Sequence, residues 1–588
     1  MIPLFPTFAL GAIALVAVGS SLHQRKKRRA VRDRLRADWG HPKNVARDLP
    51  LVASYHQAVS ADGAGAVGDR TWQDLDLDAV FRFLDRTESS VGCQSLYHRL
   101  RSTAHSPQDL AAFDEIVEAL RYDEETRLDV QIAVRALAGN STFWLWSLVL
   151  EPIEPLPRWA VIYPLFAMAM ALLIVLTAVL RGPFLLLAVV GLVGGAALRA
   201  RFGRRLVPLM EPFADMVRLL AVAKRLGRLD RLPAGMRARL AERLPALARL
   251  RRSAGWLGRA QTASLDLGGL AIEYLNLLFC LDANAAMIGA RELRAHQADV
   301  HRVLLAVGEL DAALSVASMR DGNDAWTRPV FAPDDEPVVF TDVRHPLLRN
   351  AVANSVTLGP PAGLLVTGAN MTGKSTFLRT VGVNVVLAQT INTVFASAYH
   401  APWLSVESCI SPTDDLQAGK SYYQAEVETL VAMLAATGSP GSRLYLFDEL
   451  FRGTNTLDRI GAASAVLGYL VRRAAPGRGT SDVAQGSSRA ADVAQGFSPV
   501  SANRCLVIAA THDLELVSLL PDYAVVHFAD QLTDAGLHFD YVLRPGPTTT
   551  RNAIALLGVL GAPKEVVADA LARTDRLRAA ADPESKQD

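Results

Sequence analysis

The chain has 588 residues, half of them hydrophobic, and its 61 basic and 59 acidic side chains leave a formal net charge of +2. This length suits three or four domains, and the composition describes a folded protein with membrane segments. The four cysteines stand far apart without a Cys-x-x-Cys pair, so neither a zinc site nor a disulfide framework is indicated.

The chain begins with an apolar run, Phe5 to Leu22, which is followed by the basic sequence RKKRRAVRDRLR from Arg25 to Arg36. A cleaved signal peptide carries its positive charge before the apolar stretch, whereas here the charge comes after it. We therefore predict a transmembrane helix over residues 1–22, with the N-terminus outside. A basic cytoplasmic linker over residues 23–74 follows from the positive-inside rule.

A helical segment is predicted over residues 75–158. Near its start, a Thr-x-x-x-x-Gly turn at Thr87 and Gly92 precedes a helix whose Leu96 and Leu100 share one face. A generic pair of amphipathic helices is the alternative interpretation.

The next segment is apolar and uncharged from Trp159 to Leu180. At 1.5 Å per residue it is long enough to cross a hydrocarbon core of ~30 Å. Arg181-Gly182-Pro183 interrupts it, and a shorter apolar run continues to Leu198. We predict a transmembrane hairpin over residues 159–202, with a buried core hairpin as the alternative. Together with the first span, the hairpin predicts a multi-pass protein of the inner (cytoplasmic) membrane whose larger parts lie in the cytoplasm.

A basic helical region follows. Residues 199–252 hold 15 Lys and Arg against four Asp and Glu, with Leu and Ala at helical spacing. Such a region could follow a phosphate backbone or an anionic leaflet, or it could be a solvated arginine-rich helix face. The helical pattern predicts a core and lever region over residues 203–319, and a polar linker over residues 320–337.

The stretch GANMTGKSTF, which starts at Gly368, follows a short apolar run that predicts a strand. Its Gly-x-x-x-x-Gly-Lys-Ser spacing is that of a P-loop, in which glycines let successive N–H groups face a phosphate chain. We predict that Lys374 reaches the β- and γ-phosphates of ATP, that Ser375 holds Mg²⁺, and that a helix begins at about Thr376. A chance match by a glycine-containing turn is the alternative. The predicted nucleotide-binding residues are Gly368, Ala369, Asn370, Met371, Thr372, Gly373, Lys374, Ser375 and Thr376.

Two further apolar runs end in polar residues. RLYLFDE predicts a buried strand ending in Asp448 and Glu449. Asp448 is placed to bind Mg²⁺ through water, and Glu449 to orient and deprotonate the attacking water. CLVIAAT predicts a third strand, which runs into His512 and Asp513. We expect His512 to sense the γ-phosphate, with a helix-capping turn as the alternative. The repetitive segment 476–503 between these strands predicts a disordered insertion without chemistry.

Four motifs in order resemble the ATPase domain of the MutS family, which is related to the ABC ATPases. They are TGANMTGKSTFLRTVG, AGKSYYQAEVETL, LFDELFRGTNTLDRIGAA and AATHDLEL, and the segment LRPGPTTTRNAIALLGVLGAPKEVVADA resembles the family's closing segment. The resemblance implies an α/β P-loop NTPase domain over residues 338–588 that uses ATP and Mg²⁺. It also implies a homodimer, in which Ser421 reaches the partner's γ-phosphate.

The same resemblance assigns the loop Gly453, Thr454, Asn455 and Thr456 to the contact with the opposite subunit, and His512 to the family's switch histidine. Ala369 stands where the family usually has proline, and Tyr422-Tyr423 where it usually has a phenylalanine-containing pair. Neither departure removes a phosphate or metal ligand.

The upstream segment around Thr87 and Gly92 is similar to the start of the MutS core domain. The family's mismatch readers carry a large N-terminal domain with a Phe-x-Glu wedge, and no such triplet lies between the first apolar segment and this core. Reading of mismatches by that wedge is therefore not expected.

The sequence thus predicts a membrane-anchored, MutS-like ATPase with an all-α core and lever region before the nucleotide domain. In the first of two functional interpretations, the ATPase acts on mismatched or branched DNA, in mismatch repair or recombination. In the second, DNA binding is lost and ATP drives a change in a membrane partner.

Overall fold

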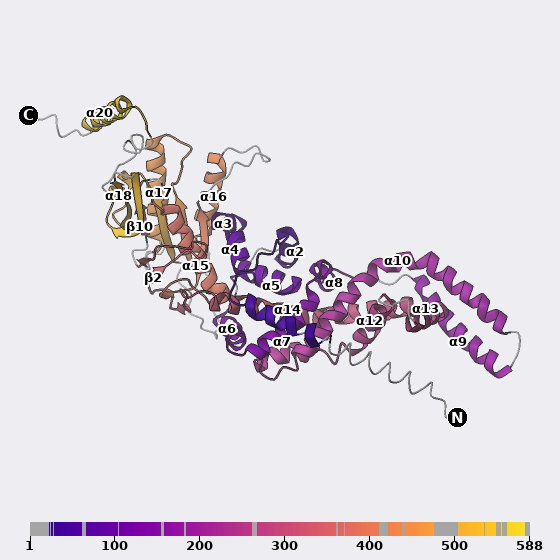
Figure 1. Cartoon of the computed structure of the whole chain (residues 1–588). Coiled ribbons are helices and arrows are strands. Elements are labelled where there is room, and N and C mark those ends of the chain that lie inside the picture. The colour runs from indigo at the N-terminus through magenta and orange to yellow at the C-terminus, as the bar shows by residue number, and fades with distance from the viewer. Residues whose placement is uncertain are drawn as a thin grey trace, which may run out of the picture. The chain divides into compact units, whose positions relative to one another are not determined.

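The computed structural model describes residues 23–581 with gaps at 24, 28, 61–65, 104, 154–157, 181–183, 262–266, 360–362, 370, 411–421, 438–440, 475–503, 534–535, 549–553 and 555–560. These residues form two compact units, each shown in Figure 1. The first consists of residues up to 64, 84–101 and 107–324. The second consists of residues 65–83, 102–106 and 325–588.

The first unit is helical throughout its described residues. Its helices include α2 (Leu49–Val59), α5 (Ser90–Arg101), α6 (Pro107–Tyr122), α7 (Glu124–Val134), α8 (Ser147–Leu150), α9 (Ile162–Leu180), α10 (Phe184–Leu226), α11 (Ala234–Ala241), α12 (Ala248–Gln261), α13 (Leu267–Phe279) and α14 (Leu281–Asp321). Short 3-10 turns lie at Arg135–Leu137, Asn140–Trp144 and Arg158–Val161. The long helix α14 packs against α5, α6, α10 and α12, and its second half is buried. This arrangement agrees with the helical region that the sequence predicts before the nucleotide domain.

The predicted turn at Gly92 is built around a buried carboxylate. Asp311 of α14 accepts hydrogen bonds from the backbone N–H of Glu88 (2.9 Å) and of Ser89 (2.8 Å), at the start of α5. A Cβ on Gly92 would lie 2.1 Å from an oxygen of Asp311, so only glycine allows this approach. Leu96 is fully buried on the same helix, as its spacing predicts.

The end of α14 lies beyond the predicted boundary at residue 320. Arg320 is 1 % exposed and pairs with Asp114 (2.6 Å) and Glu118 (2.8 Å) of α6. These two ion pairs hold the last turn of the helix, which continues to Asp321. The predicted linker also contains the short strand β1 (Val330–Phe331).

The structure supports only part of the membrane topology that the sequence predicts. Among the described residues, one stretch is long and apolar enough to cross a membrane, Trp159–Val179, and it qualifies by length and composition only. A core helix or a signal sequence would qualify equally, so a multi-pass topology is not supported. The predicted first span, Phe5 to Leu22, lies outside the described residues. The second arm of the predicted hairpin is the beginning of α10, which continues as one helix through the basic residues to Leu226, and arginine favours helix.

The second unit contains two sheets. The larger has the strand order β10-β9-β4-β8-β7-β6, and all neighbours are parallel except the pair β10 and β9. Its strands are β4 (Gly363–Thr367), β6 (Leu404–Cys409), β7 (Ser442–Asp448), β8 (Cys505–Thr511), β9 (Tyr523–Thr533) and β10 (Gly536–Pro545). The smaller sheet has the order β1-β5-β2-β3, with β2 (Val338–Val343), β3 (Asn354–Leu358) and β5 (Ala398–Ala401). The three strands that the apolar runs predict are β4, β7 and β8.

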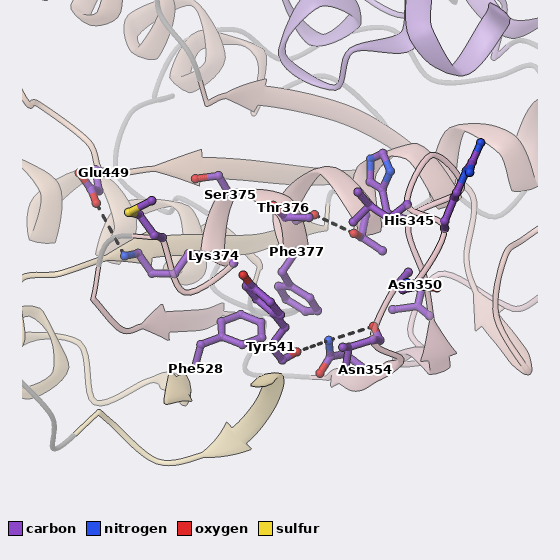
Figure 2. A pocket seen from close by; sticks show the side chains of 18 of the residues that line it. His345, Asn350, Asn354, Lys374, Ser375, Thr376, Phe377, Glu449, Phe528 and Tyr541 are labelled. Carbon is purple, nitrogen blue, oxygen red and sulfur yellow. Dashed lines mark hydrogen bonds and ion pairs between the residues drawn. The ribbon is translucent and has the colours of Figure 1, made fainter. Parts of the chain in front are cut away.

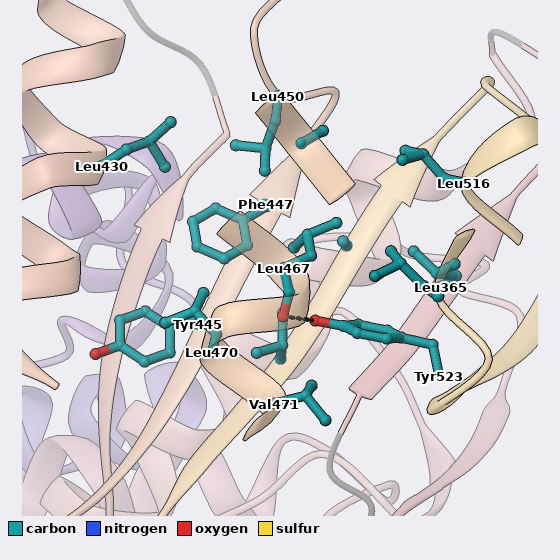
Figure 3. Close-up of a cluster of buried hydrophobic side chains, with 14 of the residues drawn as sticks. Leu365, Leu430, Tyr445, Phe447, Leu450, Leu467, Leu470, Val471, Leu516 and Tyr523 are labelled. Carbon is teal, nitrogen blue, oxygen red and sulfur yellow. Dashed lines mark hydrogen bonds between the residues drawn. The ribbon is translucent and has the colours of Figure 1, made fainter. Parts of the chain in front are cut away.

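The helices of this unit are α3 (Asp69–Asp74), α4 (Leu77–Leu84), α15 (Lys374–Ile391), α16 (Tyr422–Ala436), α17 (Thr456–Ala474), α18 (Glu515–Leu519) and α20 (Lys564–Ala581). One core cluster joins strand residues such as Phe447 to α16 through Leu430 and to α17 through Leu467 (Figure 3). Every residue of β4 and β8 is buried, which is expected of central parallel strands.

The sequence order hides one part of this unit. The segment that contains α3 precedes the ATP-binding motifs by almost 300 residues, yet it lies on the edge strand β6. Asp74 accepts hydrogen bonds from the Ser408 hydroxyl (2.7 Å) and the Ile410 N–H (3.0 Å). Its own carbonyl accepts one from Arg379 of α15 (2.8 Å). The edge strand is therefore covered rather than open.

Candidate nucleotide site

Three neighbouring parallel strands end at the same edge of the larger sheet. Thr367 of β4 pairs in register with Thr511 of β8, and Asp448 of β7 with Ala510. The residues that follow these strands therefore meet, because carboxyl ends of adjacent parallel strands share one edge. They are the loop that starts at Gly368, the carboxylate Glu449 and His512.

The loop after β4 has the backbone that a P-loop requires. Gly368 has φ 146° and Gly373 has φ 105°, both in the region that favours glycine. A Cβ on Gly368 would lie 2.9 Å from the carbonyl oxygen of Phe528. Lys374, which is 4 % exposed, donates from Nζ to the carbonyl oxygens of Gly368 (2.8 Å) and Ala369 (2.9 Å). Helix α15 begins at Lys374, so its first N–H groups face the same space.

Ser375 and Asp448 meet although 73 residues separate them: the serine hydroxyl donates to Oδ2 of the carboxylate. Burial raises the pKa of Asp448. Its second oxygen, Oδ1, is buried without a hydrogen-bond partner among the described residues. A hydroxyl beside a carboxylate with a spare oxygen is a donor set that suits Mg²⁺, which prefers oxygen ligands and retains several waters. The residues present thus fit the metal that the P-loop implies.

Glu449 faces Lys374, with 3.9 Å between Nζ and Oε1, as Figure 2 shows. His512 approaches the same oxygen at 3.3 Å. Burial alone would raise the pKa of Glu449, but the hydrogen bond with His512 and the charges of Arg452, His512 and Lys374 outweigh it and lower the pKa to about 2. The pairing in turn raises the pKa of His512. Glu449 is therefore an ionised carboxylate beside a lysine and a histidine, in a form that can accept a proton.

Comparison with known proteins agrees with this geometry. Residues 364–476 match the family model described as MutS domain V. This part of the chain is a MutS-family ATPase domain.

Curated relatives of the MutS domain are DNA mismatch repair proteins. The MutS protein of Thermus thermophilus is 32% identical over 268 residues, which cover 44% of this chain and 28% of that protein. The MutS protein of Thermus aquaticus is 32% identical over 290 residues, 48% of this chain and 31% of that protein. The MutS 2 protein of Halobacterium salinarum is 30% identical over 290 residues, 48% of this chain and 30% of that protein. The chain thus spans less than a third of the length of these relatives, and none of the matches supports membrane anchoring.

The MutS domain contains two cationic side chains that the sequence pattern did not single out. Arg452 lies 2.9 Å from Glu449 Oε2 and 3.8 Å from Asp448 Oδ2, so it holds both acids from outside. Arg459 forms two hydrogen bonds, of 2.7 Å and 2.9 Å, with Asp513, the residue after His512. The signal for Arg452 was its place three residues after Glu449, although spacing alone does not show that the chain turns back there.

The second half of the pocket was also not predicted from the sequence. A cavity of about 580 Å³ extends from the P-loop to the loop between β2 and β3 and to β10 (Figure 2). Tyr541, with φ 55°, lies over the P-loop, and a Cβ on Gly373 would meet its ring at 3.1 Å. Asn354 holds this turn, since its amide donates to the Tyr541 carbonyl (3.1 Å) and accepts from the Leu543 N–H (2.7 Å).

The far wall of this cavity contains a neutral histidine. His345 accepts a hydrogen bond from the Leu347 N–H at Nδ1 (3.3 Å), so its Nε2 carries the proton. Burial lowers the pKa of His345 to about 4. Together with Phe377 and Phe528, this wall offers apolar faces and a few polar atoms at a distance from the charged end, as a nucleotide base requires.

The residues expected to act across a dimer are described only in part. Gly453, Thr454, Asn455 and Thr456 follow the Glu449 turn directly, and the Asn455 side chain accepts the Asp458 N–H (3.0 Å) at the start of α17. Ser421 and Asn370 lie outside the described residues. The roles of all these residues remain predictions.

Proposed function

We propose that this chain is a MutS-like ATPase that hydrolyses ATP in the pocket between the P-loop and Glu449. The observation that carries the proposal is the meeting of Lys374, Ser375, Asp448 and Glu449 at one edge of the sheet. The cavity extends from the P-loop to a wall that contains His345, Phe377 and Phe528, and this supports a nucleoside triphosphate rather than a simple phosphate.

Each residue has one part in this proposal. Lys374 and the N–H groups of Gly373 and α15 bind the phosphates. Ser375 and Asp448 would hold Mg²⁺, which would neutralise charge on the phosphate oxygens. Glu449 accepts the proton of the attacking water. His512 holds Glu449 in place from the neighbouring strand.

We further propose that the working unit is a homodimer with two shared sites. Ser421 of one chain then contacts the γ-phosphate on the P-loop of its partner, and the loop Gly453 to Thr456 contacts the opposite subunit. Ser421→Arg should leave nucleotide affinity nearly unchanged and abolish turnover. When it is mixed with Lys374→Ala, activity should return in part, because one of the two sites in a mixed dimer is intact. Mixed dimers that recover no activity would argue strongly against shared sites.

The proposed binding partner of this ATPase is mismatched or branched DNA. The relatives are named DNA mismatch repair proteins, and this is the main support. The basic helical region adds little, because most of its described arginines are already paired with acids of the first unit. Ion pairs are formed by Arg218, Arg225, Arg231, Arg237, Arg239 and Arg243, with Asp215, Asp129, Asp123, Asp230, Glu309 and Asp299, respectively.

A membrane partner is the second candidate, and the surface of α9 favours it. Met168 is 66% exposed and Leu172 is 61% exposed, and no charged residue occurs along the helix. Monomeric soluble proteins rarely expose so much contiguous apolar surface. Trp159, at the start of this stretch, is of the type that collects at membrane interfaces. We propose that α9 and the beginning of α10 enter the inner membrane and keep the ATPase in the cytoplasm.

A binding panel on the detergent-solubilised protein separates the two candidates. Linear, mismatched and branched duplexes are compared with and without ATP. Tighter binding of one DNA structure that changes with ATP supports the first candidate. ATP hydrolysis without affinity for any duplex, together with recovery of the protein in the membrane fraction, supports the second.

A further inference from the structure

Helix α16 buries a carboxylate beside the nucleotide site. Glu426 is 1% exposed, and its Oε1 accepts a hydrogen bond of 2.6 Å from the backbone N–H of Phe451. Its Oε2 is buried without a hydrogen-bond partner among the described residues. Burial of a carboxylate is costly, and burial raises the pKa of Glu426. The backbone N–H of Phe451 and the charges of Arg70 and Arg452 offset part of this cost.

That N–H belongs to the turn that carries Glu449. Both Glu449 (φ 52°) and Phe451 (φ 61°) have left-handed backbone conformations, which residues other than glycine rarely adopt. The turn is attached at its start, where the Glu449 N–H donates to the Ala510 carbonyl (2.9 Å) of β8. At its end it is attached to Glu426. Two fixed points on either side of a strained turn determine where the Glu449 side chain points.

The helix that carries Glu426 is itself firmly placed. Leu430, one turn further along α16, packs in the same core cluster as Leu450, the middle residue of the turn (Figure 3). Tyr423, on the preceding turn, lies with its ring 6.4 Å from that of Phe451, and a Cβ on Gly453 would meet its Cβ at 3.0 Å. Glu426 thus extends from a firmly packed helix to a turn in which two residues have left-handed backbone conformations.

We infer that Glu426 is a positioning residue for hydrolysis, which holds the turn after β7 so that Glu449 of the same chain faces the P-loop. Glu426 does not touch the nucleotide pocket and is not among its lining residues. We assign the positioning to the acceptor oxygen that receives the Phe451 N–H, and not to the carboxylate charge, which interacts with Arg70 and Arg452.

The first experiment separates positioning from folding and from charge. Glu426→Ala removes the acceptor, Glu426→Gln keeps an acceptor oxygen without the charge, and Glu428→Ala on the exposed side of the same helix is the matched control. The Kd of ATP and the number of ATP-binding sites are titrated, and kcat is expressed per binding site. Misfolded protein, which does not bind ATP, is thereby excluded from the comparison.

We expect Glu426→Ala to lower kcat per site by about 10- to 100-fold, because small misplacements of a reacting group have effects of this size. The Kd of ATP should stay within about twofold, since P-loop contacts are unchanged. Glu426→Gln should recover most of the rate, and Glu428→Ala should match the unmodified protein. An unchanged kcat per site in Glu426→Ala would overturn the inference, and so would a Glu426→Gln variant as slow as Glu426→Ala.

A second experiment tests whether Glu426 acts in its own chain, and it rests on the proposed function of shared sites. In a mixture of Glu426→Ala with Ser421→Arg, one site combines the intact P-loop and Glu449 of the Ser421→Arg chain with the intact Ser421 of its partner. Activity should return to the level reached by Lys374→Ala mixed with Ser421→Arg. Recovery only in the mixture of Lys374→Ala with Ser421→Arg would mean that Glu426 acts on Ser421 of its own chain, and would overturn the inference. Recovery in neither would count against shared sites, and the first experiment would then decide the role of Glu426.

Discussion

Glu449 combines two properties that pull against each other. It is ionised and close to Lys374, but a carboxylate whose pKa is lowered to about 2 is a weak acceptor for the proton of water. His512 and Arg452 account for much of this lowering. The neighbours that keep Glu449 ionised thus also lower its affinity for a proton. Substitutions of Glu449, Lys374 and His512 test these roles.

Glu449→Gln should leave ATP binding intact and slow turnover by roughly 10²- to 10⁴-fold, the usual contribution of a positioned general base. Lys374→Ala should instead weaken binding itself, because the buried ammonium lies where the phosphates are expected. Equilibrium binding of a fluorescent ATP analogue and steady-state phosphate release measure the two effects. Glu515→Gln, an exposed acid after β8, is the control. Near-normal turnover in Glu449→Gln would show that another group accepts the proton.

His512→Asn should shift the acidic limb of the pH profile of kcat to higher pH. Loss of a cationic partner raises the pKa of a carboxyl group, so Glu449 would move towards its ordinary value of 4.5. The protein with His512 should therefore keep its rate to lower pH than the variant does. Turnover measured from pH 8 down to the lowest pH at which both proteins stay folded, with ATP saturating at each pH, tests this. An acidic limb at the same pH in both proteins would contradict the coupling.

The start of helix α5 in the first unit depends on one close contact, between Gly92 and Asp311. The N-terminal end of α5 is capped by a carboxylate from another helix, and a missing side chain at Gly92 makes room for it. The Thr-x-x-x-x-Gly pattern therefore has a packing reason, which the pattern alone does not contain.

Gly92→Ala should destabilise the protein by about 1–3 kcal/mol, because the added methyl group overlaps Asp311 and the surrounding core is closely packed. Gly235→Ala in α11 is the matched control, since a Cβ added there would have nothing within 4 Å and alanine favours helix. Thermal unfolding in one detergent compares the two. Equal unfolding midpoints for both variants would mean that the structure at the start of α5 shifts to make room for the added methyl group.

The helix α9 allows a test of the proposed hairpin. A reporter placed at Gly182, which lies outside the described residues, should report the outer side of the membrane. Adding Met168→Arg and Leu172→Arg should leave the reporter in the cytoplasm, because each arginine costs ~2.5–3.5 kcal/mol at the centre of a spanning helix. Leu571→Arg in α20 should not move it. A cytoplasmic reporter before any substitution would mean that the hairpin does not span.

For the whole molecule, the arrangement of charge affects how DNA would be bound. Log affinity falls with log salt by about 0.9 for each phosphate that is neutralised. Since most described arginines between Arg218 and Arg243 are already paired with carboxylates, we expect a slope equivalent to only a few phosphates. Fluorescence anisotropy with a labelled branched duplex at several salt concentrations gives this slope. A steep slope that is lost with Arg239→Gln and Arg243→Gln would show that these pairs open to DNA.

The sequence determined the parts of this protein whose chemistry is local. The P-loop is eight contiguous residues, and its glycines, lysine and serine fix its backbone and its ligands together. The strands β4, β7 and β8 were predictable because a buried parallel strand is apolar throughout, and the polar residue at its end marks the edge of the sheet.

Only the tertiary structure decided the contacts between distant segments. Tyr541 reaches the P-loop through a turn held by Asn354, Glu426 holds Phe451, and Asp311 meets Gly92 across more than 200 residues of sequence. Each of these contacts depends on which elements become neighbours, and no period or spacing in the chain records that. The sequence likewise did not show which arginines of the basic region are paired with carboxylates, because a paired arginine and a solvent-exposed arginine look the same in a sequence.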